Sequence, residues 1–476
     1  MKKKITFVSG NFNILHPGHL RLLKFAKSIT GYLIVGVNSN KIAGSAANID
    51  EKLRLESVRS CSYVDHAVLI TNSLKHTLMS YKPNVIVKGK EYENLENEEL
   101  KLLKKFNGKL IFSSGEVTFT SQDLIQKEIS ETQILNLPKS YIKNHKINFI
   151  RLRKILNNFK NQNVAVLGDL IIDNYIFCQP IGMSQEDNSL VVKESNETKF
   201  IGGAGIVALH AEGLGAKVDF FSVAGNDDEL KFAKRKLNTK RLKSYIFTDN
   251  QRPTTLKKRF KFEDQTMFRS SKLYQNSISK EIQNKVIKKI TEKINKYDLI
   301  VFSDFNYGFV TQNIVDKITQ LGKKKRIVMV ADSQSSSQDG NISRFKDMNL
   351  ITPTEREARL ACRNNEDGLI VLTSKLREEC RAKNIIIKLG PLGMIIDVTN
   401  SKKDVHETDE IPILNRFPKD VVGAGDSLLI LTALSLATGA SPWEAAFLGS
   451  IASGIQVGKN GNIPLSLKEI HSNIKK

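Results

Sequence analysis

A strand, a polar turn and the start of a helix follow one another in the stretch Ile5-Thr6-Phe7-Val8-Ser9-Gly10-Asn11-Phe12-Asn13-Ile14-Leu15-His16-Pro17-Gly18-His19. Residues 5–9 form a short, mostly apolar run that is typical of a buried strand. Apolar side chains within 19–29 then recur with helical spacing, and 32–37 is another apolar run. Near-continuous apolar strands that alternate with helices predict a parallel sheet covered on both faces, and hence the α/β class.

The same alternation runs through two separate parts of the chain. In the first, helices are expected near 51–60 and 74–81, and strands near 67–70, 85–87 and 109–112. In the second, strands are expected near 164–167, 299–302, 327–330, 348–351 and 385–387, with further strands outside the main sheet at about 175–192 and 254–269. We therefore predict a first domain over 1–137, a basic linker and helix over 138–160, and a larger α/β domain over 161–476.

The composition is that of a folded protein without membrane spans. The 476 residues are 40% hydrophobic and 26% charged, which excludes a mainly disordered chain. No run of about 18 apolar residues occurs, and the N-terminal segment lacks the long apolar stretch of a signal peptide. The four cysteines, Cys61, Cys178, Cys362 and Cys380, have no metal-ligand spacing. A cytoplasmic protein without membrane insertion is expected.

The net charge of +22 has several interpretations. A basic balance suits nucleic acid, an anionic membrane or phosphorylated small molecules. A general abundance of lysine along the chain gives the same charge without any partner. No zinc-finger, RNA-recognition or helix-turn-helix pattern is present, so we expect no nucleic-acid partner.

Two histidines mark the first candidate site. His16 and His19 follow the first strand and open the first helix, where the helix N-terminus favours anions. Between them, Gly18 removes the Cβ that would keep a ligand from the backbone. The pair can donate hydrogen bonds to the phosphates of a nucleotide. The alternative is an ordinary turn and helix cap.

On this motif, together with Pro83-x-x-x-Val87-Lys88-Gly89 and Thr118-Phe119-Thr120-Ser121, residues 5–130 resemble the cytidylyltransferase-like nucleotidyltransferases, and most of all the adenylyltransferase domain of bacterial heptose-phosphate enzymes. The resemblance implies a Rossmann-like domain in which His16 and His19 stabilise the transition state of nucleotidyl transfer. It also implies nucleotide or phosphate contacts from Phe12, Lys24, Arg54, Lys88, Thr120 and Ser121. Asn13 departs from the pattern, because the family usually has Asp there.

A glycine-rich segment marks the second candidate site. Asp420-Val421-Val422-Gly423-Ala424-Gly425-Asp426 precedes a long apolar helix. Its backbone N–H groups can converge on an anion, and Asp426 can take a proton from a hydroxyl as a general base. A glycine turn with an Asp helix cap is the alternative.

Further segments favour the functional interpretation, namely Gly168-Asp169-x-x-x-Asp173, Gly202-Gly203-Ala204-Gly205, Gly390-x-x-Gly393, Thr354-Glu355-Arg356-Glu357 and Pro253-Thr254-x-x-Lys257-x-Arg259. With them, residues 164–470 resemble the ribokinase-like (pfkB type) sugar kinases, whose fold is an α/β domain with a small β lid. The chain has no Walker-type phosphate loop.

This second resemblance implies the following roles. Asp426 is the base, and the amides of Gly423, Ala424 and Gly425 hold the transferred phosphoryl group. Nucleotide contacts come from Gly390 and Gly393, and sugar contacts from Asp173, Gly202, Gly203, Lys257 and Arg259. Glu357 organises Mg²⁺ indirectly, and Asp420 is a candidate for binding a monovalent cation, K⁺.

Four departures from the kinase pattern leave a degenerate kinase domain open as an alternative. Ile206 stands where these kinases usually have a sugar-contacting Asn, and Thr354 replaces another Asn. Ser333-Gln334 replaces a Pro-Lys pair after Asp332, and Val422 replaces a Thr.

Together the two resemblances predict a bifunctional enzyme of nucleotide-sugar synthesis. It would use ATP and Mg²⁺ to phosphorylate a heptose 7-phosphate-like sugar at its anomeric position, and would transfer a nucleotidyl group, adenylyl or cytidylyl, to a sugar 1-phosphate. The order of the domains is expected to be reversed relative to the heptose enzymes, and a homodimer is expected. The rival hypothesis is a nucleotide-sensing or single-activity protein in which the kinase domain is degenerate and only the nucleotidyltransferase works.

Overall fold

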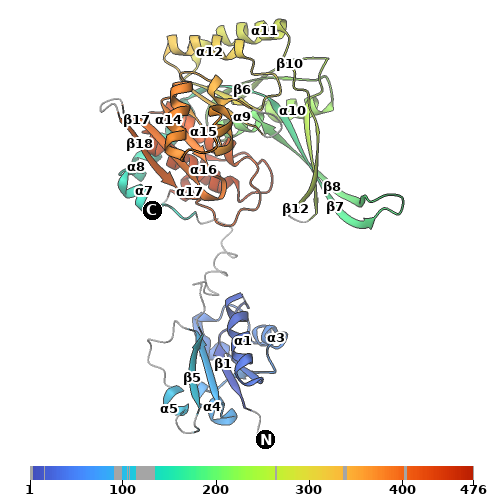
Figure 1. Ribbon diagram of the computed structural model, residues 1–476, viewed down its shortest axis with the longest axis vertical. Coiled ribbons are helices and arrows are strands. Elements are labelled where there is room, and N and C mark those ends of the chain that lie inside the picture. The colour runs from blue at the N-terminus through green and yellow to red at the C-terminus, as the bar shows by residue number, and fades with distance from the viewer. Residues whose placement is uncertain are drawn as a thin grey trace. The chain divides into compact units, whose positions relative to one another are not determined.

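The computed structural model describes residues 4–15, 17–89, 99–103, 106, 108–113, 135–262, 265–335, 340–400 and 405–474. The chain divides into two compact units, Met1–Gln133 and Ile134–Lys476 (Figure 1). Both contain sheets flanked by helices, so the predicted α/β class is confirmed. Among the described residues, no helix is long and apolar enough to cross a membrane.

The first unit is built on a five-stranded parallel sheet of order β3-β2-β1-β4-β5. The strands are β1 Thr6–Gly10, β2 Leu33–Asn38, β3 His66–Ile70, β4 Val85–Gly89 and β5 Lys109–Ser113. The helices are α1 Pro17–Thr30, α2 Asn40–Ala43, α3 Glu51–Arg59, α4 Leu74–Tyr81 and α5 Glu99–Leu103.

Alternate residues of these strands enter two separate cores, one on each face of the sheet. Val8 and Val35 lie in one core and Phe7 and Ile34 in the other. Because β1 pairs with both β2 and β4, the chain reverses its winding direction at β1. Ligands of open α/β sheets bind at such a point, beyond the carboxyl ends of the strands. The loop that carries the histidine motif begins there.

The second unit contains a nine-stranded sheet of order β10-β9-β6-β13-β14-β15-β16-β17-β18, in which only β17 runs antiparallel to the other strands. Its strands are β6 Asn163–Gly168, β9 Lys217–Ala224, β10 Leu242–Thr248, β13 Leu299–Asp304, β14 Val328–Ser333, β15 Leu350–Ile351, β16 Asn384–Lys388, β17 Met394–Asn400 and β18 Val405–Ile411.

Helices cover both faces of this sheet. The core on one face includes residues of α8 Phe149–Asn158, α9 Ala204–Gly213, α10 Asp228–Leu237, α15 Ala424–Ala437, α16 Pro442–Gln456 and α17 Leu467–Asn473. The core on the other includes residues of α11 Lys280–Thr291, α12 Gln312–Lys325, α13 Glu355–Cys362 and α14 Leu369–Cys380. Helix α15 is almost entirely buried, which explains its lack of a polar face.

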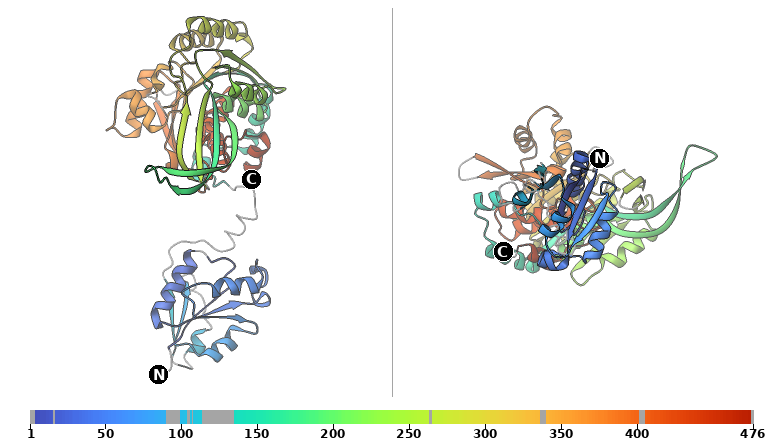
Figure 2. Two further views of the ribbon diagram at one scale, coloured as in Figure 1. Left: turned by 90° about the vertical axis from the view of Figure 1, so that its right-hand side faces the viewer. Right: turned by 90° about the horizontal axis from the view of Figure 1, so that it is seen from below.

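A separate four-stranded sheet of order β12-β11-β7-β8 stands beside the main one (Figure 2, left). Its strands are β7 Leu170–Met183, β8 Leu190–Gly203, β11 Thr255–Phe262 and β12 Gln265–Lys272. These strands contain the two insertions that the sequence predicts to lie outside the main sheet.

The basic segment 138–160 packs within the second unit. It forms α7 Lys139–Asn144 and α8, and both contribute to a core of this unit. Tyr141 is buried, and its hydroxyl donates to the carbonyl of Trp443 at 3.0 Å. Arg151 pairs with Glu444 at 2.8 Å. The charges therefore lie on solvated faces of helices whose apolar sides are covered.

Candidate functional site

Helix α15 begins at the glycine-rich segment of the second unit. Gly423 has a φ of 79°, and a Cβ there would stand 2.4 Å from the Asn462 side-chain oxygen. Only glycine therefore fits this position. The first turn contains Ala424, Gly425 and Asp426, so its backbone amides have no carbonyl partner within the helix.

Asp426 is held in this first turn with 7% of its surface exposed. Burial, and next the Asp332 carboxylate, raise the pKa of Asp426 from 3.8 to about 7. Asp173 raises it as well, whereas the cations Lys388 and Lys257 lower it. A carboxyl group that titrates near neutral pH is suited to take a proton from a hydroxyl.

Lys388, at the end of β16, places an ammonium group beside this turn. Its Nζ lies 3.0 and 2.9 Å from the two carboxylate oxygens of Asp332. A Cβ on Gly425 would lie 3.3 Å from the same nitrogen. Burial raises the pKa of Asp332 to about 6, although Lys388 opposes that shift. Lys388 stands in no motif that the sequence offers.

Glu357 belongs to a neighbouring helix start. Its two oxygens accept hydrogen bonds from the Ser335 and Thr354 amides at 3.0 and 2.7 Å, and Thr354 caps α13 in return. Thr354 thus has a structural role as a helix cap. Glu357 is buried and each of its oxygens accepts one backbone hydrogen bond, while its indirect part in magnesium binding stays a prediction.

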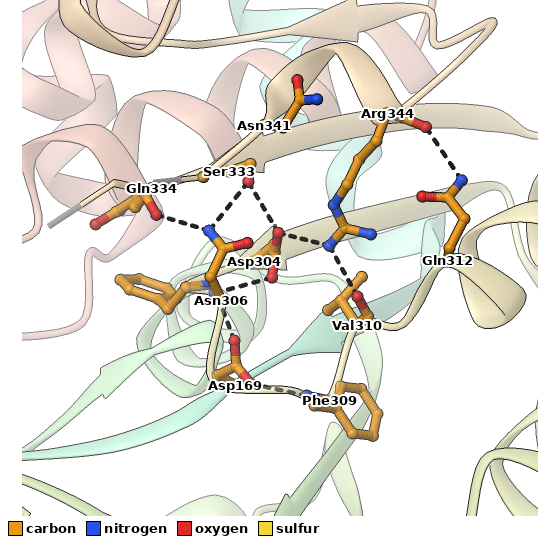
Figure 3. Close-up of polar contacts among 12 residues, drawn as sticks. Asp169, Asp304, Asn306, Phe309, Val310, Gln312, Ser333, Gln334, Asn341 and Arg344 are labelled. Carbon is orange, nitrogen blue, oxygen red and sulfur yellow. Dashed lines mark hydrogen bonds and ion pairs between the residues drawn. The ribbon is translucent and has the colours of Figure 1, made fainter. Parts of the chain in front are cut away.

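Gln334 reaches the base from the loop after β14. Its side-chain nitrogen lies 3.4 Å from Asp426 Oδ1. Figure 3 shows how this loop is held: the Asn306 amide donates to the Gln334 carbonyl at 2.9 Å, and Asp304 accepts from Ser333 and Arg344 at 2.8 and 2.7 Å. Asp304 is 1% exposed, so the hydrogen bonds that hold the Gln334 loop are anchored on a buried carboxylate.

The predicted sugar residues gather around Asp173. This buried carboxylate accepts from Arg259 at 3.2 Å and from Asn462 at 3.0 Å. A Cβ on Gly202 would lie 2.2 Å from Asp173 Oδ2, and Gly203 has a φ of 58°. Gly202 thus makes room for the Asp173 carboxylate, and Gly203 is favoured by its backbone conformation. Asn462, which the sequence analysis did not identify, links Asp173 to the turn at Gly423.

Three cations follow one face of β11 at alternate positions, namely Lys257, Arg259 and Lys261. Lys257 lies over the Tyr307 ring at 5.2 Å, and Lys261 over the Tyr175 ring at 5.0 Å. Arg259 Nε is buried without a hydrogen-bond partner among the described residues. Lys261 is 7% exposed and has no carboxylate partner in the part of the chain that the structure describes. Lys261 is not among the predicted site residues, although its alternation with Lys257 and Arg259 was a signal for it.

Asp420 stands at the start of the glycine-rich segment. The Asp420 carboxylate accepts from the Tyr175 hydroxyl at 2.7 Å and from the amides of Gly461 and Val422, both at 3.1 Å. These contacts hold the glycine-rich loop against the second sheet. A monovalent cation at Asp420 stays a prediction.

A hollow of about 540 Å³ lies between the start of α13 and the end of β16, lined by Thr354, Lys388, Leu389 and Gly390 among others. Gly390 has open space around a would-be Cβ, whereas one on Gly393 would meet the Ile411 carbonyl at 2.2 Å. Gly390 thus faces space that a ligand can use, and Gly393 is a packing glycine.

Ile206, which stands where the resembled kinases have a sugar-contacting Asn, does not lie in the sugar site. Ile206 is fully buried in α9 and belongs to the apolar core of that face. The side chain is used for packing, and the amide that contacts Asp173 comes from Asn462 instead.

In the first unit, the described part of the histidine motif forms a tight turn after β1. His19 Nδ1 lies 3.1 Å from the Ile14 carbonyl oxygen, and its ring is 5.2 Å from that of Phe12. Phe12 has a φ of 48° and is 3% exposed, so its ring supports His19 from the core rather than from the open site. His16, Thr120 and Ser121 lie outside the described residues.

Arg54 differs from its predicted role. It is fully buried, and its guanidinium donates to the carbonyls of Ile49, Asn11 and Asn38 at 2.7, 2.7 and 2.8 Å. A fourth bond goes to the Asn40 side chain at 2.8 Å. The guanidinium thus ties the loops after β1 and β2 together, and these bonds turn it away from a phosphate.

The other residues of this unit lie nearer the surface or in structural contacts. Asn13 donates to the Ala46 carbonyl at 2.8 Å and accepts from the Asn48 amide at 3.0 Å, a pair of bonds that an ionised Asp could not make. Lys88 pairs with Glu99 at 2.7 Å. Lys24 is exposed on α1.

The chain matches two known families. Residues 161–469 match the pfkB family carbohydrate kinases, and residues 7–167 match the cytidylyltransferase-like family. Over 320 residues the chain is 30% identical to the bifunctional protein HldE of Aliarcobacter butzleri, a match covering 66% of this chain and 64% of that protein. The HldE protein of Nitratiruptor sp. is 29% identical over 310 residues, 64% of each chain. The chain thus spans about 64% of the length of these curated relatives.

Solved structures of ribokinase-like enzymes share the fold. Ribokinase of Arabidopsis thaliana, complexed with ribose and ATP, has a TM-score of 0.51 at 16% identity and covers 66% of this chain and 99% of its own. Phosphofructokinase-2 of Escherichia coli, in complex with potassium, has a TM-score of 0.52 at 15% identity, with 66% and 97% covered.

Proposed function

Because the chain belongs to the pfkB family of carbohydrate kinases, we propose that its second unit transfers a phosphoryl group from ATP to a hydroxyl of a phosphorylated sugar. Asp426 carries this proposal. It combines a buried carboxyl group, a pKa of about 7 and a place in the first turn of α15 beside backbone amides that face no helical partner.

In this reaction the acceptor hydroxyl oxygen attacks the γ-phosphorus of ATP, and its proton passes to Asp426. The bond from the γ-phosphorus to the β–γ bridging oxygen breaks, and ADP leaves with that electron pair. The amides of Gly423 to Asp426 stabilise the charge on the transferred group, since preorganised donors are most effective where water is excluded.

We further propose that the acceptor is a sugar phosphate of the heptose 7-phosphate kind, phosphorylated at its anomeric position. Lys257, Arg259 and Lys261 support this class. Among the described residues one carboxylate, Asp173, forms an ion pair with these three cations, so positive charge is left over for a phosphate. Successive residues on one face of a strand stand about 7 Å apart. The three cations therefore span the length of a sugar whose far end carries a phosphate.

Magnesium would neutralise the nucleotide phosphates in this site. The described residues contain no cluster of three or more metal-ligating side chains, and Glu357 is occupied by backbone amides. We propose that the ion is held mainly by the nucleotide and that Glu357 positions the loop around it. Binding of K⁺ near Asp420 remains part of the proposal.

For the first unit we propose nucleotidyl transfer to a sugar 1-phosphate. A phosphate oxygen of the sugar attacks the α-phosphorus of the nucleotide, the α–β bridging bond breaks, and pyrophosphate leaves. His19 at the start of α1, together with His16, would stabilise the charge that develops. ATP is the proposed nucleotide, with CTP as the alternative. The proposal includes a domain order reversed relative to the heptose enzymes.

The two activities are tested on the intact protein with ATP or CTP and a panel of sugar phosphates. ADP formation reports the kinase, and pyrophosphate release reports the transferase. We expect both, with Asp426→Asn removing only the first and His19→Ala only the second. Pyrophosphate release without sugar-dependent ADP across the panel would favour a degenerate kinase, and binding of nucleotide without either product would favour a sensor. Cytoplasmic location and a homodimer stay predictions, to be checked by fractionation and sedimentation.

A further inference from the structure

Lys388 has an unusual position for a buried lysine. Its side chain is 13% exposed, and its nitrogen lies between the Asp332 carboxylate and the first turn of α15. The strand that carries it is fixed, because the Lys388 amide donates to the Pro353 carbonyl at 2.8 Å and Lys388 bridges to Thr354. The ammonium group therefore has a defined place beside Gly425.

The contacts of Lys388 leave it able to bind a ligand. Both hydrogen bonds of its ammonium group go to one carboxylate, Asp332, and an ammonium group has three donors. Lys388 also lines the hollow of about 540 Å³ that reaches Gly390. Independently of this hollow, the Lys388 nitrogen lies beside Gly425, in the first turn of α15.

Besides Asp332, two further carboxylates stabilise the charged form of Lys388. Burial lowers the pKa of Lys388, but three carboxylates outweigh burial and raise it: Asp332, Glu357 and Asp426. In addition, position 334 carries Gln where the resembled kinases carry Lys, and the Gln334 side chain reaches within 3.4 Å of Asp426. Gln334, in the loop after β14, and Lys388, at the end of β16, thus both lie near Asp426, and in this chain Lys388 carries the cation.

We propose that Lys388 is a catalytic residue of the kinase site, whose ammonium group contacts the phosphoryl group in transfer and replaces a lysine at position 334. This inference rests on the proposed kinase function. Lys388 neither gains nor loses a proton in the reaction: the hydroxyl proton goes to Asp426, and ADP keeps the electron pair of the broken bond. The lysine contributes only positive charge at the place where negative charge is transferred.

The test moves the lysine between the two positions in the intact protein. We expect Lys388→Met to lower kcat for sugar-dependent ADP formation by about 10²–10³-fold, as for other preorganised charge-stabilising donors. Adding Gln334→Lys to this variant should restore at least tenfold. Lys383→Met removes an exposed lysine just before the same strand and is the matched control, with activity within twofold of wild type.

The pH profile measures whether the charge of Lys388 acts on Asp426, and the recovery of kcat by Gln334→Lys separates a catalytic from a merely structural lysine. Asp426 faces Asp332 and Asp173, which raise its pKa, and Lys388 and Lys257, which lower it. Loss of Lys388 should therefore move the acidic limb of kcat/KM to higher pH, and Gln334→Lys should move it back. Pyrophosphate release by the first unit should stay unchanged and serves as the internal reference.

Each outcome has a definite meaning. Lys388→Met protein with activity near wild type, or a folded double variant without recovery, would overturn the assignment of Lys388 while leaving the kinase proposal intact. Wild-type protein without sugar-dependent ADP formation would overturn both. If Lys388→Met does not yield folded protein, Lys388→Gln retains a donor for Asp332 and is judged by the same two criteria.

Discussion

Replacing Asp426 by Asn should make the second unit both inactive and more stable. The amide keeps the size of the carboxylate and part of its hydrogen bonding, but it cannot accept the hydroxyl proton at neutral pH. Loss of a general base costs about 10²–10⁴-fold in rate. ATP binding should be almost unchanged, because the backbone amides of Gly423–Gly425 do not depend on this side chain.

The gain in stability follows from the raised pKa. The folded protein holds a proton on Asp426 up to about pH 7, whereas an unfolded Asp releases it near its ordinary value of 3.8. The unfolded state thus binds fewer protons between these values, and stability falls as the pH rises from about 4 to about 7. A difference of about 3 units corresponds to roughly 4 kcal/mol, an upper value because the neighbouring Asp332 carboxyl group, with a pKa of about 6, titrates in the same range.

Thermal unfolding at pH 8 and pH 5 measures this effect. We expect the Asp426→Asn variant to melt several degrees above wild type at pH 8 and to lose most of this advantage at pH 5. Asp228→Asn at an exposed helix start is the matched control and should give no such gain, because its pKa is lowered rather than raised. An Asp426→Asn variant that is no more stable than wild type at pH 8 would refute the buried charge. Sugar-dependent ADP formation at wild-type rates would refute the base.

Four further predictions test other parts of the structure. His19→Ala should lower pyrophosphate release by about 10²–10³-fold with kinase turnover intact, and full transferase activity would contradict its role. Arg54→Ala should lower the melting temperature of the first unit by removing four buried hydrogen bonds, whereas a raised KM for nucleotide at unchanged stability would restore the phosphate-binding interpretation. Lys261→Met should raise KM for the sugar phosphate at least tenfold without changing KM for ATP, and equal effects on both would contradict a substrate contact. A fragment of residues 134–476 should unfold at a higher temperature than one of residues 146–476, which lacks buried Tyr141, and equal melting temperatures would show that α7 contributes nothing.

The fold was largely predictable from the sequence because its strands are apolar and its turns are marked by glycine. The runs at 5–9 and 164–167 coincide with β1 and β6, and the insertions at 175–192 and 254–269 belong to a separate sheet. The basic segment before β6 was harder to place. Its charges resemble a linker, while its packing depends on Tyr141, which contacts Trp443 about 300 positions away, and on Leu156 in the same core.

The candidate site was predictable where function is carried by local motifs. Gly423 and Asp426 stand within four residues of each other, so spacing alone brings them together. Asn462 could not be found this way, because its neighbours Asp173 and Gly423 come from distant elements. Arg54 shows the limit of sequence motifs in the other direction: an Arg in a nucleotide-binding pattern suggests phosphate binding, but only the structure shows that backbone carbonyls accept its hydrogen bonds.

Gln334 and Lys388 bear on whether the kinase domain is degenerate. In the kinase pattern position 334 is a Lys, so Gln334 by itself removes one positive charge from the site. In three dimensions the ends of β14 and β16 converge on one carboxylate, Asp426, so a cation can be supplied from either strand without altering the base. A decayed site would have no reason to bury an ammonium group among three carboxylates, since a buried charge is stable only when its surroundings compensate it. The charge balance of the site is thus kept although its sequence pattern is not, and the exchange of lysine between positions 334 and 388 is the measurement that separates a rearranged kinase from a decayed one.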